Sequence, residues 1–299
     1  MKISLPALVF ALFSFGFFLL STACTPQEYN KHGGPFGYRI DKPDAVYTLD
    51  SELREISGLA WLSEGRLVCI QDEKADLYTF DLQKGEVISK TDFGKNDDYE
   101  GVEIVEGEQI WVVKSDGDLY HFRYTEDKDV DAKKYETDLS TANDVEGLGY
   151  NPETKQLLLA CKADPEHKHS KKYKGKAIYA FDIDKKELVE EPVLVIKDSD
   201  MATFLGEDPE RHVDFNPSAI AWHPLEHRYY ILSSVGKKIV VVDQKGEISH
   251  LIYLPSSLFR QPEGICFAPD GTMYISNEGK DGLGNMLLFK YWSPGKQDE

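Results

Sequence analysis

The chain has 299 residues, of which 41% are hydrophobic and 29% are charged. This composition is typical of a folded globular protein and excludes a disordered, a collagen-like and a multi-span membrane protein. With 34 Lys and Arg against 52 Asp and Glu, the formal net charge is −18. An acidic chain repels the phosphate backbone at long range, so we expect no nucleic-acid partner and regard cations as the natural ligands of this surface.

The N-terminus has the pattern of an export signal. Lys2 is followed by an uncharged, apolar stretch that ends in Leu20-Ser-Thr-Ala-Cys24. Small residues before a cysteine are typical of the site where a lipoprotein signal peptide is cleaved and the cysteine is lipidated. We therefore predict a signal peptide over residues 1–23 and a lipid anchor on Cys24 that attaches the protein to a membrane. The alternative is an uncleaved signal anchor, since an apolar segment of this length also spans a bilayer.

The segment after Cys24 is polar, rich in Gly and Pro, and without periodicity as far as residue 44. Such a composition is typical of a flexible linker, and we assign residues 24–44 to a tether. Thr25, in place of Asp, resembles the pattern of outer-membrane lipoproteins. We therefore expect the protein in the cell envelope at the outer membrane, with the face of that membrane left open.

One pattern recurs five times at intervals of about 45 residues, with one longer interval. It consists of a small or acidic residue, then Gly or Ala, then an apolar strand. The five copies are Ser57-Gly-Leu-Ala-Trp61, Glu100-Gly-Val-Glu-Ile104, Glu146-Gly-Leu-Gly-Tyr150, Ser218-Ala-Ile-Ala-Trp222 and Glu263-Gly-Ile-Cys-Phe267. Short alternating strands separated by turn residues follow each copy, and helical periodicity is nearly absent. The pattern predicts an all-β propeller with blades of four antiparallel strands.

We count five blades over residues 45–292, with six as the alternative, and treat residues 293–299 as a tail. The long interval contains two insertions, at residues 164–176 and 198–216, and the second leaves room for a short helix. The last repeat supplies only three strands. We predict that an N-terminal strand at residues 46–50 completes this blade and closes the ring, which removes an open sheet edge.

Three cysteines remain besides Cys24. Cys69, Cys161 and Cys266 each lie inside an apolar, strand-like run, and none has a Cys or His neighbour at metal-binding spacing. An exported compartment permits disulfides. We nevertheless expect buried free thiols, because their number is odd and their surroundings are apolar.

Five segments of the repeat resemble those of a known family. They are Ile56-Ser-Gly-Leu-Ala-Trp61, Asp98-Tyr-Glu-Gly-Val102, Asn143-Asp-Val-Glu-Gly-Leu148, Asn216-Pro-Ser-Ala-Ile220 and Gln261-Pro-Glu-Gly-Ile265. The series resembles the SdiA-regulated (YjiK-like) family and extends over about residues 45–292. The resemblance implies a five-bladed propeller distantly similar to NHL repeats, with calcium in a shared site. It implies no established biochemical role.

Two sets of polar residues should meet at one mouth of the propeller channel. The innermost strand of each blade lines the channel, and the loop that enters it lies on the same face as the loop that leaves the second strand. The first set precedes the Gly or Ala of each repeat and contains Ser57, Glu100, Glu146, Ser218 and Glu263. The second set ends the second strands and contains Asp72, Glu73, Lys114, Lys162, Asn277 and Glu278.

Three glutamates around one narrow axis would repel one another unless a cation lies between them. Oxygen ligands without Cys or a necessary His favour Ca²⁺, with Mg²⁺ as a lesser candidate. We therefore predict a calcium site at Glu100, Glu146 and Glu263. The site is incomplete where serines replace glutamate, so water or ligand would complete it. In the alternative, each glutamate bonds the turn into its own strand or pairs with Lys114 or Lys162.

These observations support two functions of different classes. The first is a lipid-anchored, calcium-binding module that presents its mouth and inserted loops to a small-molecule or protein ligand. The second is a calcium-dependent hydrolase of lactones or phosphoesters. In that enzyme Asp72, Glu73 or Glu278 would be the general base, and Lys114 or Lys162 would bind an anionic group. We favour binding, because fold does not imply activity and the sequence shows no nucleophile–base pair.

Overall fold

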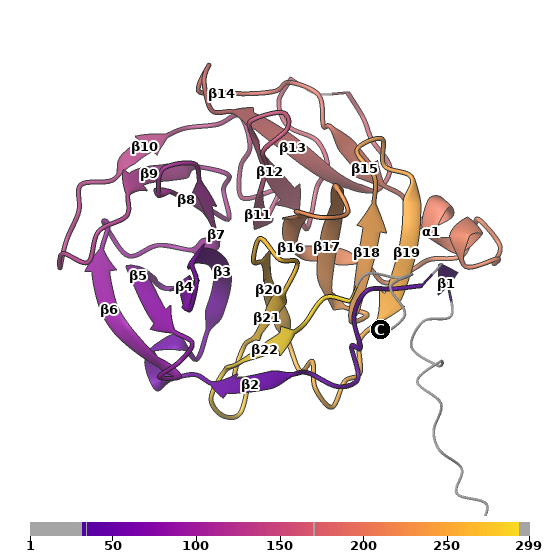
Figure 1. Cartoon of the computed structure of the whole chain (residues 1–299). Coiled ribbons are helices and arrows are strands. Elements are labelled where there is room, and N and C mark those ends of the chain that lie inside the picture. The colour runs from indigo at the N-terminus through magenta and orange to yellow at the C-terminus, as the bar shows by residue number, and fades with distance from the viewer. Residues whose placement is uncertain (1–31, 34, 170, 293–299) are drawn as a thin grey trace, which may run out of the picture.

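The computed structural model describes residues 32–33, 35–169 and 171–292. Its strands form five antiparallel sheets, which surround a central axis as the blades of a propeller (Figure 1). The predicted all-β fold with five blades is confirmed, and the described chain contains no sixth blade. In the described residues, two short helices accompany the blades, η2 (Ser51–Leu53) and α1 (Asp198–Phe204). The helix α1 lies in the second insertion, where the sequence left room for it.

Each of the five blades begins with its innermost strand and proceeds outward. Blade 1 comprises β3 (Ile56–Ser63), β4 (Arg66–Gln71), β5 (Lys74–Asp81) and β6 (Glu86–Asp92). Blade 2 comprises β7 (Tyr99–Val105), β8 (Gln109–Lys114), β9 (Leu119–Arg123) and β10 (Lys133–Tyr135). Blade 3 comprises β11 (Val145–Asn151), β12 (Gln156–Cys161) and β13 (Lys176–Asp182), with β14 (Glu187–Leu188) and β15 (Leu194–Ile196) both paired to β13.

Blades 4 and 5 both use strands from the N-terminal part of the chain. Blade 4 comprises β16 (Asn216–His223), β17 (Arg228–Val235), β18 (Lys238–Val242) and β19 (Ile248–Tyr253), with β1 (His32–Gly33) on its outer edge. Blade 5 comprises β20 (Pro262–Phe267), β21 (Met273–Asn277), β22 (Asn285–Phe289) and β2 (Ala45–Thr48). The predicted closure of the last blade by an N-terminal strand is therefore confirmed, since β2 pairs antiparallel with β22.

The tether predicted over residues 24–44 is wrong for its second half. Phe36, Tyr38 and Ile40 are 2–3% exposed and belong to the core between blades 4 and 5. The Tyr38 hydroxyl donates to the carbonyl of Gly271 at 2.5 Å and lies 2.7 Å from Nε2 of His223. The segment was assigned to a linker because of its Gly and Pro content, although residues 36, 38 and 40 are apolar or aromatic and alternate as in a strand. The predicted signal peptide and Cys24 lie outside the described residues.

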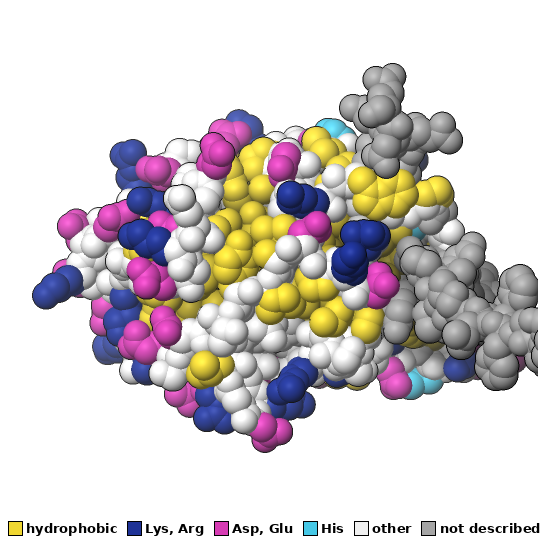
Figure 2. Space-filling view, turned by 60° about the horizontal axis from the view of Figure 1, so that its bottom comes forward, with side chains coloured by type: hydrophobic (Ala, Val, Ile, Leu, Met, Phe, Trp, Pro, Cys, Tyr) yellow, Lys and Arg dark blue, Asp and Glu magenta, His cyan; other side chains and the backbone are white. Residues whose placement is uncertain are grey.

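Among the residues that the structure describes, the hydrophobic core consists of five clusters, one between each pair of adjacent blades. Ala60 and Val102 share the cluster between blades 1 and 2, and Leu158 and Ile220 share the one between blades 3 and 4. Cys69, Cys161 and Cys266 are buried free thiols, as expected. No helix in the described part of the chain is long and apolar enough to span a membrane. On one face, hydrophobic side chains gather in the middle with acidic and basic side chains interspersed around them (Figure 2).

The inner strands approach one another so closely that they close the channel in its middle. A Cβ atom on Gly101 would lie 2.7 Å from Cβ of Leu148 and 2.8 Å from its backbone N. The glycine of the repeat is therefore required by the closeness of the next blade. The space left at this level measures only about 10 Å³ and is lined by residues such as Gly58, Gly101 and Gly264. The channel thus has two separate ends.

The candidate site at the acidic mouth of the channel

The residues singled out by the repeat are those at which each innermost strand bulges. In every blade, the register between the first two strands shifts at the residue before the Gly or Ala of the repeat. These residues are Ser57, Glu100, Glu146, Ser218 and Glu263. A β-bulge leaves one residue out of the ladder and re-aims its side chain. The fold therefore turns the same residue of each blade away from regular strand pairing.

A cavity of about 160 Å³ opens at this end of the channel. It contains all three predicted metal ligands and four further residues of the predicted mouth. Its lining comprises Glu55, Ile56, Ser57, Asp72, Glu100, Glu146, Lys162, Gln261, Glu263 and Glu278. Six carboxyl groups thus share a small cavity with one lysine. The convergence of residues that lie more than 200 positions apart in the sequence is what the propeller model predicted.

Burial makes the charged form of these carboxyl groups unfavourable. Burial, followed by the nearby Glu146 and Asp98, raises the pKa of Glu100 to about 10. Burial and Glu146 likewise raise the pKa of Glu263 to about 8. The pKa of Asp72 rises to about 6, again chiefly through burial and then through neighbouring acids. The cavity thus favours either protonation or an added cation.

Lys162 offsets part of this negative charge. Its Nζ lies 2.6 Å from Oε1 of Glu146, whose side chain is 11% exposed, and 3.9 Å from Oδ2 of Asp144. Burial lowers the pKa of Lys162, but Glu146, Asp144 and Glu263 outweigh burial and the net pKa is raised. Burial still raises the pKa of Glu146 even though Lys162 pulls it down. One of the two alternatives for Glu146, pairing with Lys162, is therefore realised in the structure.

The two serines of the ring connect neighbouring blades. The Ser57 hydroxyl donates to the carbonyl of Tyr99 in blade 2 at 2.7 Å, and the Ser218 hydroxyl donates to the carbonyl of Pro262 in blade 5 at 2.9 Å. Each accepting carbonyl belongs to the residue immediately before the next blade's glutamate. Ser57 lines the cavity, whereas Ser218 is 2% exposed and does not. Both serines thus hold the adjacent bulge in place.

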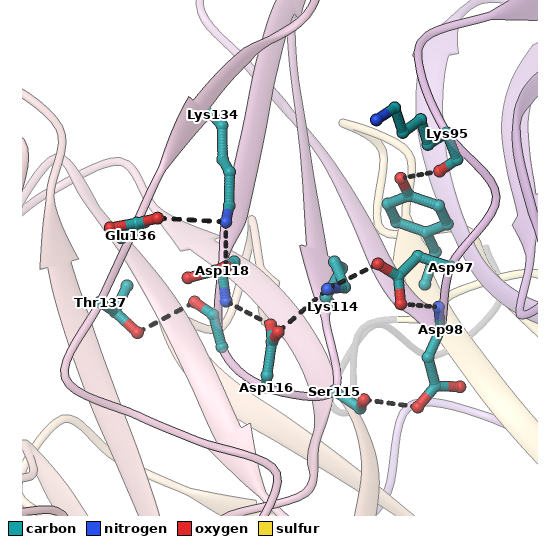
Figure 3. A network of polar contacts seen from close by, with 12 residues as sticks. Lys95, Asp97, Asp98, Lys114, Ser115, Asp116, Asp118, Lys134, Glu136 and Thr137 are labelled. Carbon is teal, nitrogen blue, oxygen red and sulfur yellow. Dashed lines mark hydrogen bonds and ion pairs between the residues drawn. The ribbon is translucent and has the colours of Figure 1, made fainter.

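Lys114 belongs to a polar network of blade 2 (Figure 3) and does not line the cavity. Its Nζ lies 2.8 Å from Oδ2 of Asp97 and 2.9 Å from Oδ2 of Asp116. Burial opposes the positive charge of Lys114, but these two carboxylates outweigh burial and raise its pKa. The adjacent Ser115 hydroxyl donates to Oδ2 of Asp98 at 2.5 Å. Of the two lysines predicted for the mouth, only Lys162 therefore lines the cavity.

Two other predicted mouth residues also lie outside the cavity lining. Glu73 is exposed at the turn after β4. Asn277 is 1% exposed and donates from Nδ2 to Oδ1 of Asn285 at 2.9 Å, so its role at the end of β21 is to join two strands of blade 5. Its neighbour Glu278 does line the cavity.

The sequence interpretation missed a second ring of polar residues. The residue two positions before each bulge bears a side-chain oxygen in every blade; these are Glu55, Asp98, Asp144, Asn216 and Gln261. Glu55 and Gln261 line the cavity, and Gln261 donates to the carboxylate of Glu278. Side chains two residues apart share one face of a strand. The fivefold recurrence of an oxygen-bearing residue was therefore a readable signal.

Both insertions lie on the same face as the mouth and enclose a cleft of about 890 Å³ between blades 3 and 4. Tyr173, Lys174 and Lys176 of the first insertion line one side of it. Nζ of Lys176 donates to the carbonyl of Lys162 at 2.6 Å, so the cleft and the cavity share a wall. Its volume lies within the range of about 300–1,000 Å³ typical of small-molecule pockets.

The first insertion is held at its base by a buried side chain. Asn143 is fully buried, and its Nδ2 donates to the carbonyl of Asp164 at 2.9 Å and to that of Glu166 at 2.7 Å. The hydroxyl of Tyr179 donates to the carbonyl of Pro165 at 2.7 Å. This insertion is therefore anchored to blade 3 where it leaves the sheet.

The donor chemistry of the cavity fits a hard divalent cation. Apart from Lys162 and the amide nitrogen of Gln261, its polar lining consists of carboxylate, amide and hydroxyl oxygens. Among the described residues, Oδ1 of Asp72 is buried without a hydrogen-bond partner. Ca²⁺ takes six to eight such oxygens. As the side chains stand, however, no three acidic, His or Cys side chains of the described chain converge closely enough to enclose a metal ion. Glu146 is instead engaged by Lys162.

The fold and the mouth define the class of protein as a five-bladed β-propeller with one acidic channel entrance. The model of the SdiA-regulated family matches residues 36–281. The chain therefore belongs to the SdiA-regulated family, as the sequence resemblance implied.

Solved structures share this fold at low sequence identity. The glutaminyl cyclase of Myxococcus xanthus has a TM-score of 0.55 at 12% identity, with 84% of this chain and 95% of that chain covered. A luciferin-regenerating enzyme has a TM-score of 0.52 at 11% identity, with coverage of 83% and 95%. A glucose dehydrogenase has a TM-score of 0.51 at 13% identity, with coverage of 83% and 100%. These likenesses show the fold alone. No curated protein matches the chain in sequence.

Proposed function

We propose that this protein is a lipid-anchored, calcium-binding propeller that acts as a ligand-binding module in the cell envelope. The observation that carries the proposal is the convergence of Glu100, Glu146 and Glu263, from three bulged strands, in one cavity of about 160 Å³. Burial, together with the neighbouring acids, raises their pKa values, and Lys162 offsets only part of the negative charge of the three ionised carboxylates. A divalent cation would supply that charge and an open coordination position for a ligand oxygen.

The cleft beside the mouth supports the binding role. It is about 890 Å³ in volume and adjoins the cavity through the contact between Lys176 and Lys162. A ligand seated in the cleft could reach a cation held by the glutamates. The export signal pattern and Cys24 support attachment to the outer membrane, since residues 1–23 have the features of a lipoprotein signal peptide.

The test is the thermal stability of chelator-treated protein with and without Ca²⁺. At a calcium concentration one hundred times Kd, binding stabilises the folded state by about 2.7 kcal/mol. In a chain of this size this corresponds to a rise in Tm of about 5–10 °C. We expect Glu146→Gln and Glu263→Gln to abolish the rise. Glu73→Gln is the matched control, since Glu73 is exposed and lies outside the cavity lining, and should leave the rise unchanged. An identical melting curve at millimolar calcium would refute the calcium site.

One observation favours a second function, that of a calcium-dependent hydrolase of lactones or phosphoesters. Asp72 lines the cavity with a pKa of about 6, raised by burial, and its Oδ1 has no hydrogen-bond partner among the described residues. A carboxylate that titrates near neutral pH suits a general base. Turnover of such substrates that needs Ca²⁺ and is lost in Asp72→Asn would establish this function.

A further inference from the structure

The opposite end of the channel has a different character from the mouth. There the five inner strands surround a second pocket of about 230 Å³. Four blades contribute an aromatic side chain to its lining, namely Trp61, Tyr150, Trp222 and Phe267. Blade 2 contributes a carboxyl group, that of Glu103. The pocket is therefore an aromatic enclosure that holds one acidic residue.

Glu103 interrupts an otherwise regular feature of the repeat. The residue two positions after the repeat's Gly or Ala is small in the other four blades, where it is Ala60, Gly149, Ala221 and Cys266. A small residue at this place fits the crowding of strands around the axis. A long, ionisable side chain in one blade alone is not required by the fold. It points to a role that the other blades do not share.

The carboxyl group of Glu103 is fixed but lacks a counterion. Its Oε1 accepts a hydrogen bond from the backbone N–H of Ile104 at 2.8 Å. Burial raises its pKa to about 7, while the backbone N–H groups of Ile104 and Tyr150 act in the opposite direction. No cationic side chain of the described residues contributes to this pKa. The pocket thus holds a carboxyl group that is negative when ionised and lies in apolar surroundings. A bound cation would be its natural partner.

We propose that this pocket binds the quaternary ammonium head group of a small organic cation. Aromatic rings attract such cations through their π faces, and a nearby carboxylate adds charge pairing. A single carboxyl group among aromatic side chains lacks the oxygen ligands that Ca²⁺ or Mg²⁺ requires. The volume lies below the range of about 300–1,000 Å³ that suits drug-sized ligands, so a head group is the part that fits.

The rim of the pocket is stiff, which favours a preformed site. Pro152, Pro224 and Pro269 line it at the turns that follow the inner strands of blades 3, 4 and 5. Proline fixes the backbone and reduces the entropy lost when a ligand binds. Trp222 is in addition packed against Tyr229, with ring centroids 5.1 Å apart. The enclosure therefore needs little rearrangement to receive a ligand.

This site is independent of the mouth. Ser57 and Trp61 lie four residues apart on β3, a separation of about 13 Å along a strand. The channel between them is closed at the level of the repeat glycines, where only about 10 Å³ of space remains. Failure of the calcium proposal would therefore leave the organic-cation proposal standing, and the reverse also holds.

The decisive experiment compares a cation with its neutral isostere on the purified protein. Choline and 3,3-dimethylbutan-1-ol have the same shape, but only choline is charged. Binding is measured by isothermal titration calorimetry and by the change in tryptophan fluorescence, since Trp61 and Trp222 both line the pocket. We expect saturable binding of choline with an affinity at least tenfold above that of the alcohol. Equal affinities, or no binding of choline at millimolar concentration, would overturn the proposal.

Variants locate the binding to this pocket. Glu103→Gln should weaken choline at least tenfold and leave the alcohol unchanged. Glu106→Gln is the matched control, because Glu106 is an exposed acid on the following turn and does not line the pocket. Trp222→Leu should weaken both compounds. Choline affinity that survives Glu103→Gln would refute the role of this carboxylate, whereas Glu146→Gln at the mouth should leave choline affinity unchanged.

Discussion

The two ends of the channel are built from the same five strands, yet they differ in nearly every chemical property. At the mouth, each inner strand bulges and presents a polar side chain, and six carboxyl groups share the cavity with Lys162. At the opposite end, aromatic side chains surround the single carboxyl group of Glu103. The repeat thus fixes where side chains converge, while the departures of individual blades from the repeat decide what converges there.

The two ends of the channel also suit different kinds of cation. Clustered carboxyl oxygens favour a hard divalent ion, since many oxygens are needed to replace its water. Aromatic rings with one carboxylate favour a weakly hydrated organic cation. Both ends use the negative charge of acidic side chains. The mouth does so through clustered carboxyl oxygens, and the opposite end through one carboxylate among aromatic rings.

The largest expected effect is the pH dependence of stability without calcium. Glu263 has a folded pKa of about 8 and Glu103 one of about 7, both above the value of about 4.3 for an unfolded glutamate. The folded protein therefore retains protons that the unfolded chain has lost. Stability from these groups is complete below about pH 4.3 and is lost as pH rises through the folded pKa values. In chelator, Tm should fall by roughly 10 °C between pH 5 and pH 8.5.

Two variants remove the contributions of Glu263 and Glu103 to this pH dependence, while the contribution of Glu100, whose folded pKa is about 10, remains in both. Glu263→Gln should flatten the slope up to about pH 8, whereas Glu103→Gln should flatten it only up to about pH 7. Saturating Ca²⁺ should restore stability at high pH in the Glu103→Gln protein. A melting temperature that rises steadily with pH in chelator would contradict the raised pKa values at both ends.

A smaller loss of stability is expected when the barrier between the ends is overfilled. Gly101→Ala places a methyl group 2.7 Å from Cβ of Leu148, so the strand must shift. Overpacking of this kind costs about 1–3 kcal/mol, which corresponds to a fall in Tm of about 3–8 °C. Gly94→Ala is the control, since no atom lies within 4 Å of its added Cβ. Equal melting temperatures for the two variants would argue against a tightly closed channel.

The smallest effect concerns the lysine at the mouth. The substitution Lys162→Met, which removes the charge, should strengthen calcium binding by about two- to tenfold at pH 8. The positive charge of Lys162 lies 2.6 Å from Glu146 and competes with the ion. The control is Lys114→Met, whose lysine pairs with Asp97 and Asp116 outside the cavity lining. It should change calcium affinity by less than about twofold. Calcium affinity measured by calorimetry distinguishes the Lys162 variant from the Lys114 variant. Weaker calcium binding in Lys162→Met would contradict the expected competition and would mean that Lys162 supports the site.

Some features of the site were readable in the sequence and others were not. The repeat located the glutamates, because a residue at one place in every blade returns to one place around the axis. The same logic applied to the preceding oxygen-bearing residues would have found Glu55 and Gln261. The sequence did not show where the Lys114 side chain lies. A side chain at the end of a second strand turns inward or away depending on its neighbours, which here are Asp97 and Asp116.

The sequence by itself determined the five blades, the closing N-terminal strand and the family, because each rests on a periodic pattern of short strands that has few other solutions. Only the tertiary structure decided that Phe36, Tyr38 and Ile40 are core residues, since burial depends on surfaces from blades 4 and 5 that are distant in the chain. It also decided that Glu146 meets Lys162 and that Glu103 enters an aromatic pocket. Side-chain direction at a crowded axis is set by packing between blades, and no local pattern encodes it.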